Sequence, residues 1–220
     1  MKAVLISIQP YWVFLIIAKM MGWNIPQEKT VEVRKNYPKD EGWNKTAKIY
    51  CSKDKRSFSK IPKEYQPSME RFLGKVIGEF VCDSIDTVDV IDTALMRYLR
   101  INGKADMFFR QESCLDVDAL YKYLLRSTGY GWHITQLKIY DEPKPLWKFM
   151  KCGAPSEKEL DEELCSYCEQ TEWGERRSYG TPTGPVMCEG AFCGEAYDLY
   201  LDEHFTLKRP PQSWCYVEEL

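Results

Sequence analysis

Two spacings of hydrophobic residues along the chain indicate where its strands and helices lie. Residues 2–8 and 46–52 are short apolar runs, which favour strands. Pro10 is followed by apolar residues at helical spacing, which predicts a helix over residues 10–21 packed against a sheet. The same reasoning predicts a second helix over 116–126 and further strands at 30–35, 75–92 (one long strand or a pair), 133–141 and 213–218.

Strands dominate this pattern and their pairing is non-local, which favours an α+β fold built on a small β-barrel with flanking helices. Two segments interrupt the strands. Residues 53–69, rich in Lys, Ser and Pro, are expected to form an excursion between strands, and residues 101–109, with an Asn-Gly turn, a second one.

The segment 29–34 departs from simple apolar–polar alternation because it is densely charged. Strand geometry places its odd-numbered residues on one face and its even-numbered residues on the other. Lys29, Glu32 and Arg34 would then lie close together at the edge of a core, where burial and pairing shift pKa values most. The segment is a candidate site, and a surface strand with ordinary ion pairs is the alternative.

Length and composition are those of one globular domain, with or without an insertion: 220 residues, 44% of them hydrophobic. The formal net charge of −3 gives no global attraction to nucleic acid, so any basic surface must be local. Residues 29–75 supply one, whereas the acidic excess falls later, in 157–175 and at Glu218-Glu219. For residues 53–63 taken alone, a solvated lysine-rich loop is an equal alternative.

The apolar N-terminal region does not have the pattern of a targeting signal or a membrane span. Gln9-Pro10 splits the apolar run and Lys19 closes it, which leaves pieces too short to cross a bilayer. Nine cysteines without a secretory signal favour a reducing compartment, so a cytoplasmic protein is expected.

An ordered set of short motifs resembles the ASCH domain of the PUA-like superfamily, in its phage-associated type. The matching segments are Leu5-Ile6-Ser7-Ile8-Gln9-Pro10-x-Trp12, Lys29-x-x-Glu32-x-Arg34, Gly74 to Asp83, Trp132-His133-Ile134, Ile139-Tyr140-Asp141-x-Pro143 and Pro210 to Glu218. Gln27 stands where the family usually has a glycine. The resemblance implies a PUA-like barrel formed by residues 1–150 and 206–220.

The same resemblance implies candidate catalytic residues. Small ASCH enzymes that hydrolyse N4-acetylcytidine use the lysine of the motif, a threonine, and a glutamate ahead of a helix. In this chain these positions carry Lys29, Glu32 and Glu112, so a carboxylate replaces the hydroxyl and can act as a base but not as the same nucleophile. Glu112 has an ordinary alternative as an acid near a positive helix end.

A nucleobase or nucleotide ligand would use donors, acceptors and aromatic faces. Lys29 and Arg34 can donate to phosphate or carbonyl oxygens. The candidate contacts beyond them are Trp12, Trp132, His133 and Trp214. Each aromatic has a core role as its alternative, and His133 has a structural one.

Residues 151–205 carry a separate signal, a cysteine-rich insertion. Two close pairs about twenty residues apart have the spacing of a closed, structural tetrahedral zinc site, with Cys165, Cys168, Cys188 and Cys193 as ligands. Cys152 is an alternative ligand, and unrelated free cysteines are the alternative reading of the pairs.

Three functions are compatible with these patterns. The first is an RNA- or nucleotide-binding protein with a charged cleft. The second is a hydrolase, either an amidohydrolase acting on a modified nucleoside or a ribonuclease. The third is a phage-encoded adaptor whose zinc insertion contacts another protein.

The zinc site gives the first testable prediction. The purified protein should carry about one equivalent of zinc, and Cys165→Ser should release it and loosen the insertion, because a closed site loses its geometry without one ligand. Metal content and limited proteolysis measure this, with Cys114→Ser as the control. A metal-free preparation with a fully ordered insertion would contradict the assignment.

Overall fold

A computed structural model describes residues 2–39, 43–105, 108–153, 202 and 205–219. The chain divides into two compact units, one formed by residues 1–146 and 209–217 and the other by 147–208 and 218–220. Each unit is described by itself.

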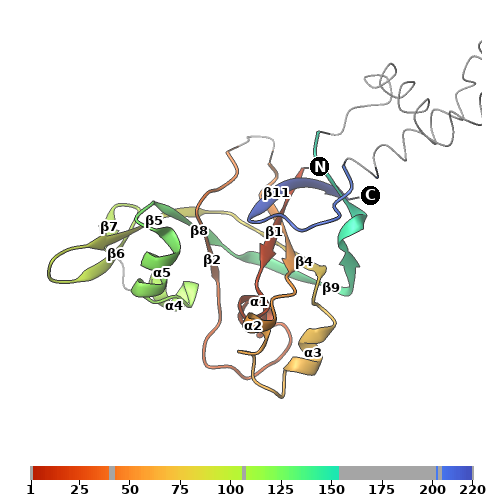
Figure 1. Cartoon of the computed structure of the whole chain (residues 1–220), viewed down its shortest axis with the longest axis horizontal. Coiled ribbons are helices and arrows are strands. Elements are labelled where there is room, and N and C mark those ends of the chain that lie inside the picture. Colours follow the sequence, from red (N-terminus) through yellow and green to blue (C-terminus); the bar gives the residue numbers. More distant parts are fainter. Residues whose placement is uncertain (1, 40–42, 106–107, 154–201, 203–204, 220) are drawn as a thin grey trace, which may run out of the picture. The chain divides into compact units, whose positions relative to one another are not determined.

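The first sheet of the first unit brings the two ends of the chain's described part together (Figure 1). Its strand order is β11-β1-β3-β4-β9, where β1 pairs with β3 in parallel and all the other pairs are antiparallel. Leu5 of β1 lies opposite Lys48 on one side and Cys215 on the other. The strands are β1 (Ala3–Ile8), β3 (Thr46–Cys51), β4 (Lys75–Val81), β9 (Thr135–Pro145) and β11 (Trp214–Glu219).

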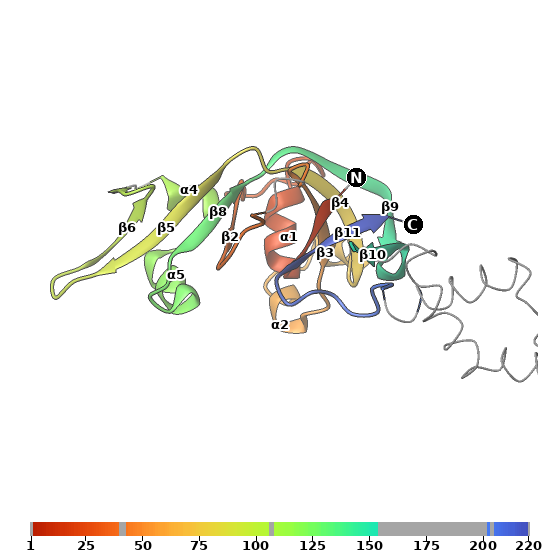
Figure 2. The same cartoon turned by 90° about the horizontal axis from the view of Figure 1, so that it is seen from above.

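Helix α1 (Pro10–Ile17) packs its apolar residues into the main core with one face of this sheet. The helix is shorter than the predicted 10–21. Gly22, at φ +66°, turns the chain, and Trp23 donates its backbone N–H to Ala18 and stacks on Phe14 with ring centroids 5.3 Å apart. Figure 2 shows α1 between β2 and the strands of the first sheet.

The second sheet has the order β2-β8-β5-β6-β7 and is antiparallel throughout. Its strands are β2 (Val31–Arg34), β5 (Ile85–Asp92), β6 (Arg97–Ile101), β7 (Lys104–Ala105) and β8 (Gly129–His133). Helices α4 (Phe109–Ser113) and α5 (Val117–Leu124) contribute Phe109, Leu120 and Leu124 to a second core shared with this sheet.

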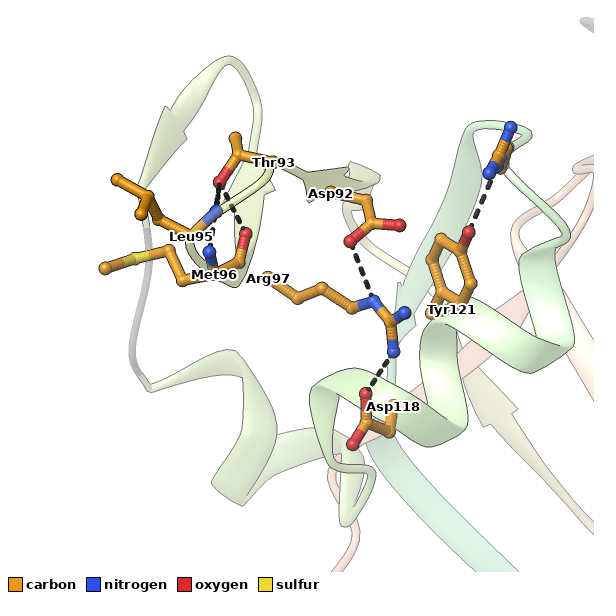
Figure 3. A network of polar contacts seen from close by, with 8 residues as sticks. Asp92, Thr93, Leu95, Met96, Arg97, Asp118 and Tyr121 are labelled. Atoms are coloured by element: carbon orange, nitrogen blue, oxygen red, sulfur yellow. Dashed lines mark hydrogen bonds and ion pairs between the residues drawn. The ribbon is translucent and has the colours of Figure 1, made fainter.

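The β5–β6 hairpin is fixed to α5 by an arginine (Figure 3). Arg97 lies between Asp92, at 2.9 Å, and Asp118, at 2.7 Å, and its guanidinium stacks 4.2 Å from the centre of the Tyr121 ring. Thr93 accepts from and donates to the backbone of the turn, which gives the hairpin tip a defined conformation.

Residues 53–69 form two short helices, α2 (Lys55–Phe58) and α3 (Gln66–Glu70), where the sequence predicted only an excursion. Asp54 caps α2 by accepting from the backbone of Arg56 and Ser57. Ile61 and Met69 are buried in the main core, so this segment is anchored on the sheet.

The α+β class is confirmed, but within the described residues the strands form two open sheets and no closed barrel. The second unit contains β10 (Phe149–Lys151), which follows the 3-10 turn η1 (Leu146–Lys148), and Met150 forms a bridge with Thr206. The four predicted zinc ligands lie in 154–201, outside the described residues.

Close contact between β4 and β9 generates the second prediction. A Cβ at Gly78 would lie 2.2 Å from the backbone oxygen of Lys138 and 3.0 Å from Ile139 Cα. Gly78→Ala should therefore lower the free energy of unfolding by about 1–3 kcal/mol, because backbone must move to relieve the clash. Denaturant unfolding measures the loss, and Lys75→Ala, at an exposed position of the same strand, is the control. Equal stabilities of the two variants would contradict this packing.

Candidate functional site

A cavity of about 490 Å³ lies in the first unit beside the charged face of β2. Its walls come from the end of β1, the first turn of α1, β2 and the residue Lys29 before it, the segment after β3, the residues before α5 and its last turn, and the residues before β11. The lining residues are Ser7, Gln9, Trp12, Lys29, Glu32, Val33, Arg34, Ser52, Asp54, Leu115, Tyr123 and Gln212.

A buried carboxylate between two buried cations forms one wall of this cavity. Glu32 places Oε2 at 3.4 Å from Lys29 Nζ and Oε1 at 3.0 Å from Arg34 Nη2. All three residues are buried: Lys29 is 2% exposed, Glu32 6% and Arg34 7%. Such a group is held together because leaving any one of these charges alone in the interior is costly.

The burial of β2 on both faces explains this arrangement. Val31 and Val33 point into the second core, and Glu32 and Arg34 alternate onto the opposite face, as the sequence predicts. Lys29 does not share a strand face with Val31 and Val33 as predicted, because β2 begins only at Val31 and the alternation does not extend back to the lysine. Its ammonium does lie beside Glu32, as predicted. The three charges are also buried, where the sequence placed them at the edge of a core.

Lys29 is fully engaged by protein groups. Its ammonium donates to the backbone oxygens of Val31 and Ser113, each at 2.7 Å, and faces Glu32. Burial lowers the pKa of Lys29, and the nearby Glu32 carboxylate opposes that shift. Because an ammonium has three N–H donors, a ligand could bind Lys29 directly only by displacing one of these partners.

One N–H donor of Arg34 has no acceptor among the described residues. Its Nη2 donates to the backbone oxygen of Ser7 and to Glu32, whereas its buried Nε has no hydrogen-bond partner among the described residues. The buried hydroxyl of Ser52, another cavity residue, has none there either. Two polar atoms without protein partners therefore lie in residues that line one cavity.

Aromatic and amide side chains complete the lining. Trp12 is half-buried, with its ring centre 5.3 Å from Lys29 Nζ. Tyr123, on α5, has its pKa raised by burial, and Arg34 and Glu32 are the charged groups that act on it. Gln9 and Gln212 are exposed at the cavity. Of these residues only Trp12 was predicted as a ligand contact, and Tyr123 carried no local signal beyond its place on an apolar helix face.

Three predicted contacts lie away from the cavity. Trp132 is fully buried in the main core, and Trp214 donates Nε1 to Asn36 at 2.8 Å. His133 Nε2 lies 2.7 Å from Asp86 Oδ2, in a half-exposed pair. None of the three lines the cavity, so their structural alternatives fit the geometry.

Glu112 does not join the charged group. It lies on α4 with its side chain exposed, and its backbone oxygen accepts from the Thr30 N–H at 2.9 Å. The structure therefore brings together Lys29 and Glu32, but not Glu112, of the three predicted catalytic residues.

A second cavity, of about 610 Å³, lies between the tip of the β5–β6 hairpin and the start of α5. Its charged groups are largely engaged with one another, because Arg97 is held by two aspartates and Asp116 caps α5. We therefore regard the first cavity as the candidate site.

Possible metal ligands do not gather in the part of the chain that the structure describes. It contains no group of three or more His, Cys, Asp or Glu side chains that could hold a metal ion. Of its helices, none is both long enough and apolar enough to cross a membrane.

Comparison with known proteins gives one likeness in structure. The sequence matches no family model and no curated protein. Among solved structures, the chain is similar to a crystal structure of a mutant of the ZmASCH protein from Zymomonas mobilis. The two are 12% identical, the match covers 93% of this chain and 99% of that one, and the TM-score is 0.38.

The buried charges generate the third prediction. Glu32→Gln should lower the free energy of unfolding by about 3–5 kcal/mol, because it leaves two buried cations without a counter-charge. Glu28→Gln is the control: its carboxylate is partly exposed, 3.8 Å from Lys19, and its loss should change stability by no more than about 0.5 kcal/mol. Denaturant unfolding compares the two, and a loss at Glu32 no larger than at Glu28 would contradict the buried group.

Proposed function

We propose that the cavity binds a nucleobase, carried by a nucleotide or by RNA. Its volume of about 490 Å³ falls in the range of small-molecule sites, roughly 300–1,000 Å³. Its lining combines a few fixed polar groups with aromatic surface, which is the composition that such sites share.

The unpartnered Nε of Arg34 is the observation that carries this proposal. A buried N–H without an acceptor costs about 1–3 kcal/mol, and more when the group is charged. A carbonyl oxygen or ring nitrogen of a base in the cavity would satisfy it. The Ser52 hydroxyl can donate or accept and suits a second polar atom of the same ring.

The charge balance of the lining favours an uncharged ring over a phosphate. Lys29 and Arg34 supply two positive charges, and Glu32 and Asp54 supply two negative ones, so the formal sum is zero. A phosphate placed here would face two carboxylates, one of them buried, with no net compensating charge. A neutral base meets no such penalty.

Stacking and edge recognition have suitable groups as well. Trp12 and Tyr123 offer aromatic surface, and stacking of a base on an aromatic side chain is worth about 1–3 kcal/mol. Gln9 and Gln212 each present both a donor and an acceptor, which matches the mixed polar edge of a base. The resemblance of the sequence motifs to ASCH domains implies the same class of ligand.

The hydrolase alternative has less support from the geometry. Glu112 is exposed and outside the cavity lining, and the donors of Lys29 are taken by Val31, Ser113 and Glu32. Of the predicted catalytic carboxylates only Glu32 lines the cavity, and its two oxygens are paired with Lys29 and Arg34. An adaptor function has no counterpart among the features of this cavity.

Arg34→Lys tests the proposal, because it keeps a positive charge beside Glu32 but removes the Nε donor. Binding of nucleosides and short single-stranded RNA should weaken about 10- to 100-fold, as expected for a lost hydrogen bond from a charged donor. Calorimetry with the four nucleosides and fluorescence anisotropy with labelled RNA measure the change. The control is Arg100→Lys, at an exposed arginine on β6 that pairs with Asp89.

The two variants must first be shown to fold, by circular dichroism and thermal unfolding. Wild-type affinity in a folded Arg34→Lys protein would contradict the proposed contact, and no binding of any nucleoside or RNA by the parent would contradict the function. Conversion of N4-acetylcytidine to cytidine, lost in Glu32→Gln, would instead favour the hydrolase.

A further inference from the structure

A row of basic residues follows the cavity directly along the chain. Ser52 and Asp54 line the cavity, and the chain continues from them into α2 and the turn after it. Residues 53–63 contain five basic residues and one acidic residue, in a protein whose formal net charge is −3. The basic residues are Lys53, Lys55, Arg56, Lys60 and Lys63, all exposed.

These cations are not neutralised by neighbours. No carboxylate of the described residues forms an ion pair with any of the five, although several other lysines and arginines of the first unit do so. The one acid of the segment, Asp54, accepts from two backbone N–H groups of α2. The segment therefore carries positive charge that no described carboxylate pairs with, and it adjoins Ser52 and Asp54 of the cavity lining in the chain.

The backbone that carries them is fixed, which distinguishes it from a solvated loop. Ser57 is buried and its hydroxyl accepts from the Tyr11 N–H at 3.0 Å, which ties α2 to α1. Ile61 is 2% exposed, and Lys60 and Lys63 flank it on the surface. A rigid backbone lowers the entropic cost of ordering these side chains against a partner.

We propose that this basic segment, residues 53–63, holds the phosphates of a single-stranded nucleic acid, one base of which occupies the cavity. The inference rests on the proposed function and narrows its ligand from a nucleotide to a strand. The neutral cavity and the charged segment divide the ligand between them: the base enters the first, and the backbone follows the second. A duplex is unsuitable because a paired, stacked base must first be extruded from the double helix before it can enter a cavity.

The salt dependence of binding tests this division in the intact protein. Affinity for labelled single-stranded decamers of uridine, cytidine or adenosine nucleotides should fall with salt, with a slope of log K against log[salt] of about −0.7 for each phosphate contacted. Binding of the matching free nucleosides should depend little on salt, because the cavity is neutral. If a nucleoside binds, but the decamer binds no more tightly and its affinity does not depend on salt, the proposed contact with the phosphates of a strand is overturned. The proposed base site would stand in that case.

Lys60→Gln/Lys63→Gln removes two of the cations without touching the cavity lining. For the decamer that binds best, its affinity should drop about tenfold at moderate salt, and the slope should become shallower by about 1.4, the share of two contacts. The matched control is Lys104→Gln/Lys122→Gln, which removes two exposed lysines of the second sheet and α5. If the two double variants lose the same affinity for the decamer, the attraction is non-specific and the proposal is overturned.

Two further experiments distinguish a single strand from a duplex and from a membrane surface. Single-stranded RNA should bind at least tenfold more tightly than a duplex of the same sequence, and equal binding of the two would overturn the proposal. Anionic vesicles of phosphatidylserine and phosphatidylcholine should not compete with the decamer. Displacement of the decamer by vesicles at the same salt concentration would assign the segment to a membrane surface instead.

Discussion

The buried carboxylate of Glu32, between Lys29 and Arg34, belongs to a charge group that links the two sheets of the first unit and helix α4. Arg34 is on β2 of the second sheet and donates to Ser7 of β1 in the first. Lys29 holds the backbone of Ser113 at the end of α4. One buried charge group thus connects two sheets and a helix, and the cavity lies where these elements meet. Its chemistry follows from that position, because the ammonium of Lys29 is fully engaged by protein groups, whereas the Nε of Arg34 and the hydroxyl of Ser52 have no partner among the described residues.

Much of the fold could be predicted from the sequence, because strands buried on at least one face have a recognisable local pattern of apolar residues. Residues 3–8, 31–34, 46–51 and 214–219 are strands where such runs predicted them. The β5–β6 hairpin was missed beyond Asp92, since Arg97–Ile101 alternates exposed charged and aromatic residues with buried apolar ones over only five positions. β8 was missed because two glycines within five residues hide its strand character, although packing against Phe109 and Leu124 requires them.

The candidate site could be predicted only in its charged part. Lys29, Glu32 and Arg34 lie close in sequence, so their proximity is a local matter, whereas Ser7, Ser52 and Gln212 reach the cavity through the pairing of strands far apart in the chain. The residue types alone could not separate Trp12, which lines the cavity, from Trp132, which is core. That difference depends on which side of a sheet or helix each ring faces. Glu112 lies outside the cavity lining because it is on α4, a single short turn, with its side chain exposed.

The place of β11 beside β1 has a consequence for how the protein acquires its site during synthesis. β1 lies between β3 and β11, and its partners in β11 follow it by roughly 210 residues, with the Ser7 N–H also donating to Ser213. On a ribosome, β1, α1, β2 and β3 are translated early and can associate, but one edge of β1 and the Gln212 wall of the cavity stay open until residues 212–217 have left the exit tunnel. The nascent chain therefore exposes an unpaired strand edge while the roughly 200 residues between β1 and β11 are synthesised, and the site closes only after β11 has emerged.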